Sequence, residues 1–145
     1  MTDQRETTGP AIVTGEFEVV GWDDTLYFES EDPDGTKLAR VTVRKTFTGA
    51  VAGTSVTELL TAGGGTGRGY VASELFEGSI DGRKGSVVFQ HGGVGDDTGG
   101  EAFGNIVPGT GSGELAGLRG AVSYRHDEAG AVVTLTLVPR PLRTL

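Results

Sequence analysis

The segment 41–48 alternates between two kinds of side chain without a break. Thr42, Arg44, Thr46 and Thr48 are polar, and the residues between them are Val41, Val43, Lys45 and Phe47. Because successive side chains of a β-strand point to opposite faces, this pattern predicts a strand with one solvent face. The mostly apolar set then faces a core, and Lys45 lies among it.

Similar segments recur along the whole chain, and turn residues separate them. The 145 residues include 26 glycines, which cluster between the alternating segments without the three-residue period of collagen. We expect strands at about 11–20, 41–48, 54–60, 70–77, 85–91, 102–107, 120–126 and 131–138. Between them we expect an acidic turn at 29–35, glycine-rich loops at 63–67 and 92–100, and one helical turn at 114–118. Short strands without helices are typical of a sandwich or a barrel.

The fold class predicted from these segments is all-β, a closed eight-stranded antiparallel β-barrel. Eight strands enclose an interior that side chains fill or that holds one small ligand. The length suits a single domain, which we place at 11–138, with a flexible N-terminal tail at 1–10 and a C-terminal tail at 139–145.

Charge and composition narrow the classes of partner. A net charge of −8 repels nucleic acids and anionic membrane surfaces, so neither is expected as a partner. The chain has no cysteine, and therefore no disulfide or thiolate chemistry. We find neither an apolar signal segment nor an apolar run of 18 residues, and expect a cytoplasmic location.

The Asp81-Gly82 pair predicts a two-residue hairpin turn. Such a turn places Ile80 opposite Arg83 and Glu74 opposite Phe89, and register decides which side chains share a face. The face that we assign to the interior carries Tyr70, Glu74, Phe76, Val87, Phe89 and His91. An aromatic face with two ionisable groups is expected of a ligand cavity.

Two other hairpins add to the predicted interior. A turn centred on Val51-Ala52 places Phe47 opposite Val56 and Lys45 opposite Glu58, which matches apolar with apolar and cation with anion. Glu58 then faces inward beside Lys45. In the last hairpin, one face carries Val122, Tyr124, Val133, Leu135 and Leu137.

The main catalytic candidates are Lys45, Glu58 and Glu74. Neighbouring carboxylates in a poorly solvated pocket raise each other's pKa, whereas a lysine lowers it. The balance predicts one carboxyl group that is protonated near neutral pH and exchanges protons with a substrate. The alternatives are a structural salt-bridge network and a register that is off by one residue and puts a glutamate in water. His91 is a further acid–base candidate, with a solvent-facing histidine at a strand end as its alternative.

Aromatic side chains are the candidates for substrate binding. Phenol or indole donors could enter the cavity from Tyr70, Tyr124 and Trp22. The alternative is that these side chains pack in the core, with their polar tips satisfied nearby. The predicted apolar wall consists of Phe47, Phe76 and Phe89. His91 and His126 are separated by three strands and show no ligand spacing, so no metal site is expected. The segment 109–114 superficially matches a phosphate-binding loop, but it lacks a lysine and a βαβ unit, and we interpret it as a rim loop.

Several motifs carry a resemblance to a known family. They are Gly-Glu-Phe-Glu-Val at 15–19, Lys-Thr-Phe-Thr-Gly at 45–49, Gly-Thr-Ser at 53–55, Glu-Leu-Phe-Glu-Gly at 74–78, the segment 85–91, and the segment 108–120, which ends in Gly-Leu-Arg-Gly. With these motifs, which cover about 11–138, the chain resembles small uncharacterised bacterial proteins related in fold to allene oxide cyclase and the dirigent proteins. The segment 92–104 is longer and richer in glycine than this resemblance implies.

The resemblance implies an allene oxide cyclase-like barrel that holds a hydrophobic ligand and steers a cyclisation without metal or cofactor. We therefore expect a cofactor-free cyclase or isomerase acting on a polyketide-like molecule or an oxidised lipid, with Glu74, Glu58 or His91 moving protons. The alternatives are a non-catalytic carrier of such a molecule and an oligomerising structural domain with a filled barrel. The inward glutamates favour an enzyme over a filled barrel.

An apolar patch on the outward face predicts self-association. Val71, Leu75 and Val88 fall on the face that we assign to the outside. Barrels of this kind often cover such residues with a second copy, so we expect a homodimer or homotrimer.

Overall fold

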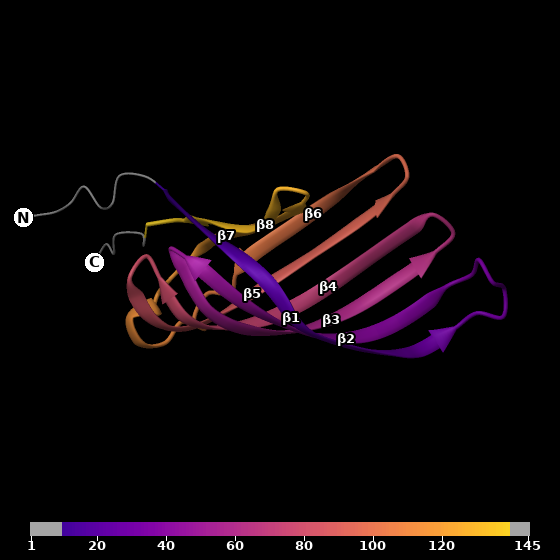
Figure 1. Ribbon diagram of the computed structural model, residues 1–145, viewed down its shortest axis with the longest axis horizontal. Helices are drawn as coiled ribbons and strands as arrows, with labels where there is room; N and C mark the ends of the chain where they lie inside the picture. Colours follow the sequence, from indigo (N-terminus) through magenta and orange to yellow (C-terminus); the bar gives the residue numbers. More distant parts are fainter. Residues whose placement is uncertain (1–9, 140–145) are drawn as a thin grey trace, which may run out of the picture.

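The computed structural model describes residues 10–139, which form an all-β fold (Figure 1). Its strands are β1 (Ala11–Glu29), β2 (Lys37–Gly49), β3 (Val51–Gly64), β4 (Gly67–Ile80), β5 (Arg83–Asp96), β6 (Gly99–Ile106), β7 (Gly120–Asp127) and β8 (Gly130–Leu137). Each strand pairs antiparallel with the next, and β8 pairs with β1, so the sheet runs in a ring. The predicted all-β class with eight antiparallel strands is confirmed. Apart from Pro10 and Pro139, the predicted tails lie outside the described residues.

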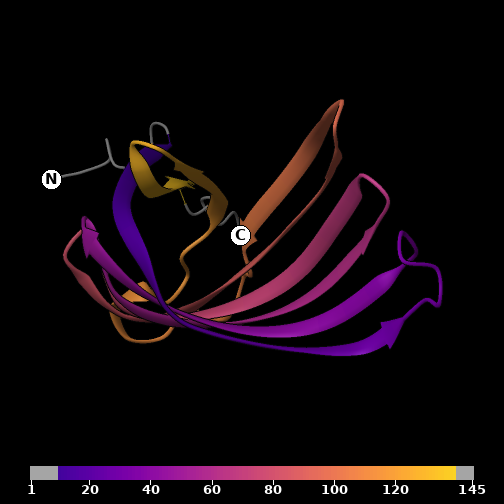
Figure 2. The same ribbon diagram turned by 45° about the vertical axis from the view of Figure 1, so that its right-hand side comes forward.

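The two ends of the ring differ because the strands differ in length. β7 and β8 have 8 residues each, whereas β2 to β5 have 13 or 14 and β1 has 19. β8 covers β1 only from Ala11 to Glu16. Figure 2 shows the far ends of the β1–β2, β3–β4 and β5–β6 hairpins reaching away from β7 and β8 as a curved sheet. The ring therefore has an enclosed end and an open end.

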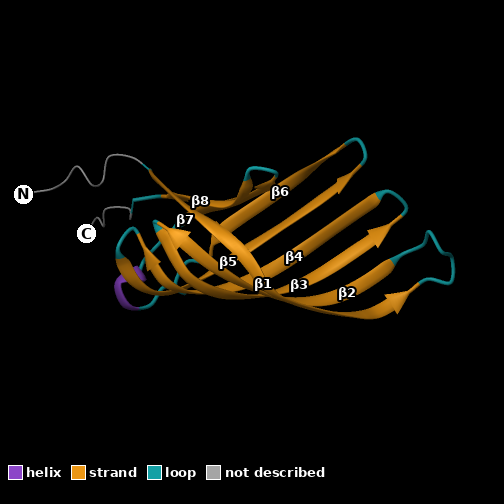
Figure 3. Cartoon of the chain, in the orientation of Figure 1, coloured by secondary structure: helices purple, strands orange, loops and turns teal. Residues whose placement is uncertain are grey.

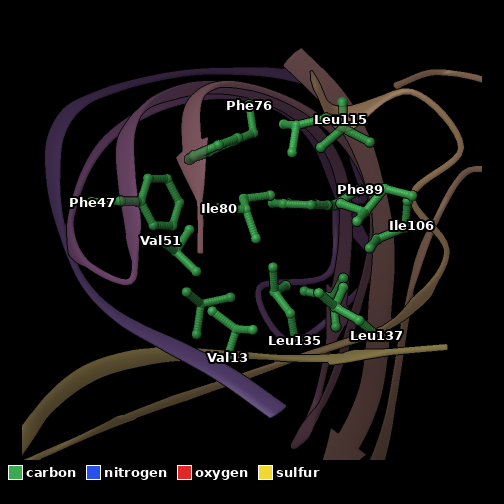
Figure 4. Close-up of a cluster of buried hydrophobic side chains, with 14 residues drawn as sticks. Val13, Phe47, Val51, Phe76, Ile80, Phe89, Ile106, Leu115, Leu135 and Leu137 are labelled. Carbon is green, nitrogen blue, oxygen red and sulfur yellow. The ribbon is translucent and has the colours of Figure 1, made fainter. Parts of the chain in front are cut away.

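Apolar side chains fill the enclosed end (Figure 4). Phe76 and Phe89 are fully buried and stacked, with ring centroids 5.8 Å apart, and Phe47 meets Phe76 edge-on at 5.4 Å. The remaining core comes from all parts of the chain and includes Val13, Val51, Ile80, Val87, Ile106, Leu115, Leu118, Val122, Val133, Leu135 and Leu137. Phe47, Phe76 and Phe89, which we predicted to contact a substrate, are buried in this core.

The sheet curls sharply where two glycines lie opposite each other on β3 and β4. Gly53 pairs with Gly78. A Cβ atom on Gly78 would lie 2.1 Å from the carbonyl oxygen of Ala52, and one on Gly53 would lie 2.2 Å from that of Glu77. Only glycine allows the two backbones to approach this closely.

A loop takes the place of a strand along one edge of β5. β6 and β7 share a single residue pair, Asn105 with Ala121, and the segment 107–114 covers the first half of β5. Side-chain oxygens of Thr110, Ser112 and Glu114 accept hydrogen bonds from the backbone N–H groups of Val88, Ser86 and Lys84, respectively, at 3.0, 3.2 and 2.8 Å. Figure 3 shows this loop with its short 3₁₀ turn, η2 (Gly113–Leu115), at the enclosed end. The interpretation of 109–114 as a rim loop thus agrees with the structure.

Two predicted loops are strands in the structure. β3 continues through the glycines to Gly64, and β4 begins at Gly67. Likewise β5 continues to Asp96, and β6 begins at Gly99. The ladder hydrogen bonds join backbone groups, so glycine-rich segments pair once their neighbours hold them in place. The glycines of 92–100 therefore lengthen the sheet at its open end.

The predicted register of the β2–β3 hairpin is wrong. Lys45 pairs with Ser55 and Phe47 with Gly53, because the turn closes tightly at Ala50, next to Gly49 with its positive φ of 98°. The predicted pairing is three residues away from this one. An odd shift moves a whole strand to the other face, so Glu58 lies on the outside.

Candidate functional site

A cluster of polar side chains occupies the interior just above the apolar core. Five strands supply it, because the inner faces of neighbouring strands meet at this level: Lys45 from β2, Ser55 and Thr57 from β3, Glu74 from β4, His91 from β5 and Tyr124 from β7. The two-residue turn at Asp81-Gly82 produces the predicted register, with Glu74 opposite Phe89 and Ala72 opposite His91. The predicted inward positions of Glu74, His91, Lys45 and Tyr124 are confirmed.

Glu74 is the centre of this cluster and is fully buried. Its Oε1 accepts hydrogen bonds from Tyr124 Oη at 2.6 Å and from His91 Nε2 at 2.9 Å. Its Oε2 accepts one from Ser55 Oγ at 2.6 Å and lies 3.2 Å from Lys45 Nζ. A buried carboxylate is stable only when donors and a counter-charge surround it, as they do here.

The protonation state of Glu74 follows from these contacts. Burial alone raises the pKa of Glu74, but the hydrogen bond from His91, the charge of Lys45 and the hydrogen bonds from Ser55 and Tyr124 together lower it to about 2. The side chain is therefore a carboxylate at neutral pH. The expected protonated carboxyl group is wrong, because the second carboxylate that was to raise this pKa, that of Glu58, is not in the interior.

Glu58 instead forms part of the outer surface. Its carboxylate accepts hydrogen bonds from Thr42 Oγ1 at 2.8 Å and from Arg40 Nε at 3.1 Å. These bonds to Thr42 and Arg40 lower the pKa of Glu58. On this face it does not contact the interior cluster.

Lys45 balances the charge of Glu74. The side chain is nearly buried, and its Nζ atom lies 4.5 Å from the ring centroid of Tyr124 and 4.9 Å from that of Phe17. Aromatic faces attract a cation, most strongly where water is excluded. The interior thus holds one fixed positive and one fixed negative charge.

His91 links Glu74 to the open end of the interior. Its Nε2 atom faces the carboxylate, which only accepts hydrogen bonds, so Nε2 carries a proton. In a neutral ring Nδ1 is then the acceptor, and Tyr70 Oη donates to it at 2.9 Å. The result is a hydrogen-bonded chain from Tyr70 through His91 to Glu74. Burial and the charge of Glu74 raise the pKa of Tyr70, so the phenol keeps its proton at rest.

This chain lies against a cavity of about 190 Å³. The cavity is lined by Phe17, Val19, Trp22, Val43, Lys45, Thr57, Leu59, Tyr70, His91, Tyr124 and His126. It continues into a trough of about 700 Å³ between the long hairpins, which shares Trp22, Leu59 and Tyr70 with it. Gly93, Gly95, Gly100 and Ala102 also line this trough and leave it wide.

Trp22 reaches the cavity because β1 contains a bulge. The pairing with β2 shifts between Val19 and Gly21, so that Trp22 pairs with Val43, a buried residue of the inner face. Without the extra residue, Trp22 would point outward. It is 60% exposed and lies at the mouth. Phe17, Ser55 and Thr57 also belong to the site but were not among the predicted site residues. The correct β2–β3 register places Ser55 and Thr57 on the inner face.

Among residues 10–139, no three side chains of His, Asp or Glu come together as a metal site. That part of the chain also contains no helix that is long and apolar enough to cross a membrane.

Comparison with known proteins supplies the family. A family model described as a protein of unknown function, DUF3224, matches residues 13–137. The chain belongs to the DUF3224 family. A crystal structure of another DUF3224 protein of unknown function, from Shewanella oneidensis MR-1, is similar, with 30% sequence identity and a TM-score of 0.78. The match covers 92% of this chain and 99% of that chain. No functionally curated protein matches the chain.

Proposed function

We propose that this DUF3224 protein is a cofactor-free isomerase or cyclase for a hydrophobic small molecule, which it binds inside a closed, allene oxide cyclase-like barrel. The observation that carries the proposal is the Tyr70–His91–Glu74 chain at the wall of a mostly apolar cavity. Cavities with a few convergent polar groups and ionisable side chains with shifted pKa values are typical of ligand and active sites.

The three side chains have the arrangement of a general base with its orienting group. Glu74 accepts from His91 Nε2, so it fixes the ring and stabilises the imidazolium that forms when Nδ1 takes up a proton. Tyr70 is hydrogen-bonded to Nδ1 and lines the cavity with His91. Glu74 is thus a positioning residue, whereas Tyr70 is the group that contacts the substrate.

Proton transfer along this chain is balanced within the protein. A C–H bond of the substrate breaks as its proton moves to Tyr70 Oη, and the phenolic proton moves to His91 Nδ1 at the same time. The reverse transfer delivers a proton to a different atom of the substrate. The substrate is isomerised or cyclised, and no oxidant or reductant is consumed.

The shape of the interior supports a substrate that is flexible and apolar. The small cavity holds the reacting part next to Tyr70, and the trough with Trp22 at its entrance receives the rest. Holding a flexible molecule in one reactive shape is by itself a large part of catalysis. Polyketide-like molecules and oxidised lipids have these properties.

A non-catalytic carrier is the second candidate, and the open trough favours it. A trough of about 700 Å³ that is continuous with the cavity allows a ligand to enter and leave without a conformational change. Binding without conversion of the ligand would identify the protein as a carrier.

The test is turnover by the Tyr70→Phe variant. The protein is incubated in D₂O with polyketide-like and oxidised-lipid compounds, and the products are analysed by mass spectrometry. We expect isomerised product that carries deuterium, and a turnover that falls by roughly 10²–10⁴-fold in Tyr70→Phe, the usual scale of general acid–base catalysis. Tyr27→Phe is the matched control, since Tyr27 is exposed. Equal turnover in Tyr70→Phe and the wild type would refute the role of the chain.

A further inference from the structure

Thr57 has a buried hydroxyl group without a hydrogen-bond partner. Its side chain lies on the inner face of β3, opposite Glu74, and the residue is 1% exposed. Among the buried side-chain nitrogen and oxygen atoms of residues 10–139, only Thr57 Oγ1 is unpaired. Buried hydroxyls are almost always paired, so this one calls for an explanation.

The other hydroxyl, imidazole and ammonium groups around Thr57 each have at least one acceptor within the protein. Lys45, Ser55, His91 and Tyr124 donate to Glu74, and Tyr70 donates to His91. Ser55 lies two residues before Thr57 on the same face, and its hydroxyl is used by the protein itself. The hydroxyl hydrogen of Thr57 therefore remains for a molecule in the cavity that Thr57 lines.

We infer that Thr57 is the specificity-determining residue of the cavity and binds an oxygen acceptor on a ligand that is otherwise apolar and uncharged, such as a ketone. This inference rests on the proposed function, because it names the class of substrate for the same cavity. It adds that the substrate carries a carbonyl-type oxygen next to the carbon that reacts.

The charges of the interior favour an uncharged ligand. Glu74 and Lys45 compensate each other at 3.2 Å. A carboxylate bound at Thr57 would lie next to Glu74, on the facing residue of β4, and like charges repel strongly where water is excluded. Because the two charges of the interior are already paired with each other, an ionised ligand of either sign would lose its hydration without gaining a free counter-charge. A neutral carbonyl oxygen is therefore the acceptor that fits.

A carbonyl oxygen at Thr57 also suits the chemistry at Tyr70. Both side chains line the same cavity of about 190 Å³, and the inference requires that a carbon next to the carbonyl group meets the phenol. When that carbon loses its proton, negative charge develops on the oxygen. A hydroxyl donor already aimed at the oxygen stabilises this charge.

The test compares α-tetralone with tetralin, a hydrocarbon of the same shape without the carbonyl oxygen. Binding to the wild type and to Thr57→Val, which keeps the shape of the side chain and removes the hydroxyl, is measured by NMR titration. We expect α-tetralone to bind the variant roughly 3- to 10-fold more weakly than the wild type, the usual effect of one neutral hydrogen bond. Tetralin should bind both proteins equally.

The stability of the free protein separates this role from a structural one. Thr57→Val removes a hydroxyl that the free protein leaves unpaired, so its thermal unfolding midpoint should equal or exceed that of the wild type. Ser55→Ala is the matched control on the same face, and its midpoint should fall because the hydroxyl of Ser55 is bonded to Glu74. A lower midpoint for Thr57→Val would show that its hydroxyl is bonded in the free protein, and would overturn the inference.

The binding results distinguish this inference from the proposed function. If α-tetralone binds the wild type and Thr57→Val equally, the role of Thr57 is wrong and the proposed function stands. If tetralin carboxylate binds more tightly than α-tetralone, the assignment of an uncharged ligand is wrong. If none of the three molecules binds the wild type, the proposed function fails together with the inference.

Discussion

Glu74 is the residue on which the interior depends. It is fully buried and pairs with Lys45, and Ser55, His91 and Tyr124 also donate to it. Removing one member of a buried ion pair leaves the other charge without compensation. The same contacts hold His91 in the orientation that the proposed proton transfer requires.

Glu74→Gln keeps the shape of the side chain and removes its charge, so Lys45 becomes an unpaired buried cation. We expect a loss of about 3–5 kcal/mol in the free energy of unfolding at pH 7, with the fold retained. Turnover should fall by roughly 10²–10⁴-fold if the proposed function is correct. Urea denaturation measures the stability, and Glu58→Gln is the control. Since Glu58 is on the surface, its replacement should change stability by less than about 0.5 kcal/mol.

The pH dependence of stability gives an independent measure of the same residue. The pKa of Glu74 in the folded protein is about 2, below its ordinary value of 4.5. The ionised Glu74 therefore contributes its full stabilisation to the fold above pH 4.5, and this contribution is lost as the pH falls toward 2. It amounts to on the order of 3 kcal/mol. Glu74→Gln should lack this part of the pH dependence, and identical profiles for the two proteins would contradict the assignment.

At the scale of elements, the loop 107–114 forms hydrogen bonds with the edge of β5 where no neighbouring strand pairs with it. Three hydrogen bonds join Ser112 and Ser86. Ser112 N donates to Ser86 O at 2.8 Å, Ser112 Oγ accepts from Ser86 N at 3.2 Å, and the two hydroxyl groups are bonded to each other at 2.6 Å. Gly85 allows this approach, because a Cβ atom there would lie 2.0 Å from the carbonyl oxygen of Ser112. The loop therefore protects an edge that would otherwise expose unpaired backbone groups.

Ser112→Ala removes the acceptor for the backbone N–H of Ser86. We expect a loss of about 1 kcal/mol in the free energy of unfolding and faster hydrogen exchange at the Ser86 amide. Ser123→Ala on the exposed face of β7 is the control and should change neither quantity. Unchanged exchange at Ser86 in Ser112→Ala would show that the side chain contributes nothing to the edge.

The molecule as a whole has an apolar outer surface as well as an apolar interior. Val56 and Leu60 on β3 and Val71 and Leu75 on β4 are 36–53% exposed on the outer face. Val56 pairs with Leu75 and Leu60 with Val71, and the polar pair of Glu58 and Ser73 lies between these two apolar pairs. Val88, which we predicted to join this patch, is only partly exposed. Contiguous exposed apolar residues often mark an interface between proteins.

We expect this surface to be covered by another copy of the chain in a homodimer or homotrimer. Leu75→Lys places a charge in one of the two apolar pairs and should give a monomer in sedimentation experiments at high micromolar concentration. Ile12→Lys is the control, because Ile12 is exposed on β1, away from the patch. A wild-type protein that sediments as a monomer at that concentration would contradict the prediction.

The interior residues of the β4–β5 hairpin follow from the amino-acid sequence. The turn at Asp81-Gly82 has positive φ at both residues, 53° and 82°, which is the conformation that Asp-Gly favours in a two-residue turn. A two-residue turn fixes the register of the hairpin. The alternation of side chains along each strand then places Tyr70, Glu74 and His91 on one face. Turn chemistry and side-chain periodicity are local properties, and local sequence specifies them.

Contacts between strands that are far apart in the chain come from closure of the ring. Tyr124 on β7 reaches Glu74 on β4, 50 residues away, and the ionised state of Glu74 depends on that contact and on Lys45 from β2. The segment from Gly49 to Gly53 contains no turn pair as specific as Asp81-Gly82, so the sequence pattern alone did not identify the tight turn and the register that put Glu58 outside. Which strands meet across the interior depends on the length, twist and edges of all eight strands together, and no local pattern contains that information.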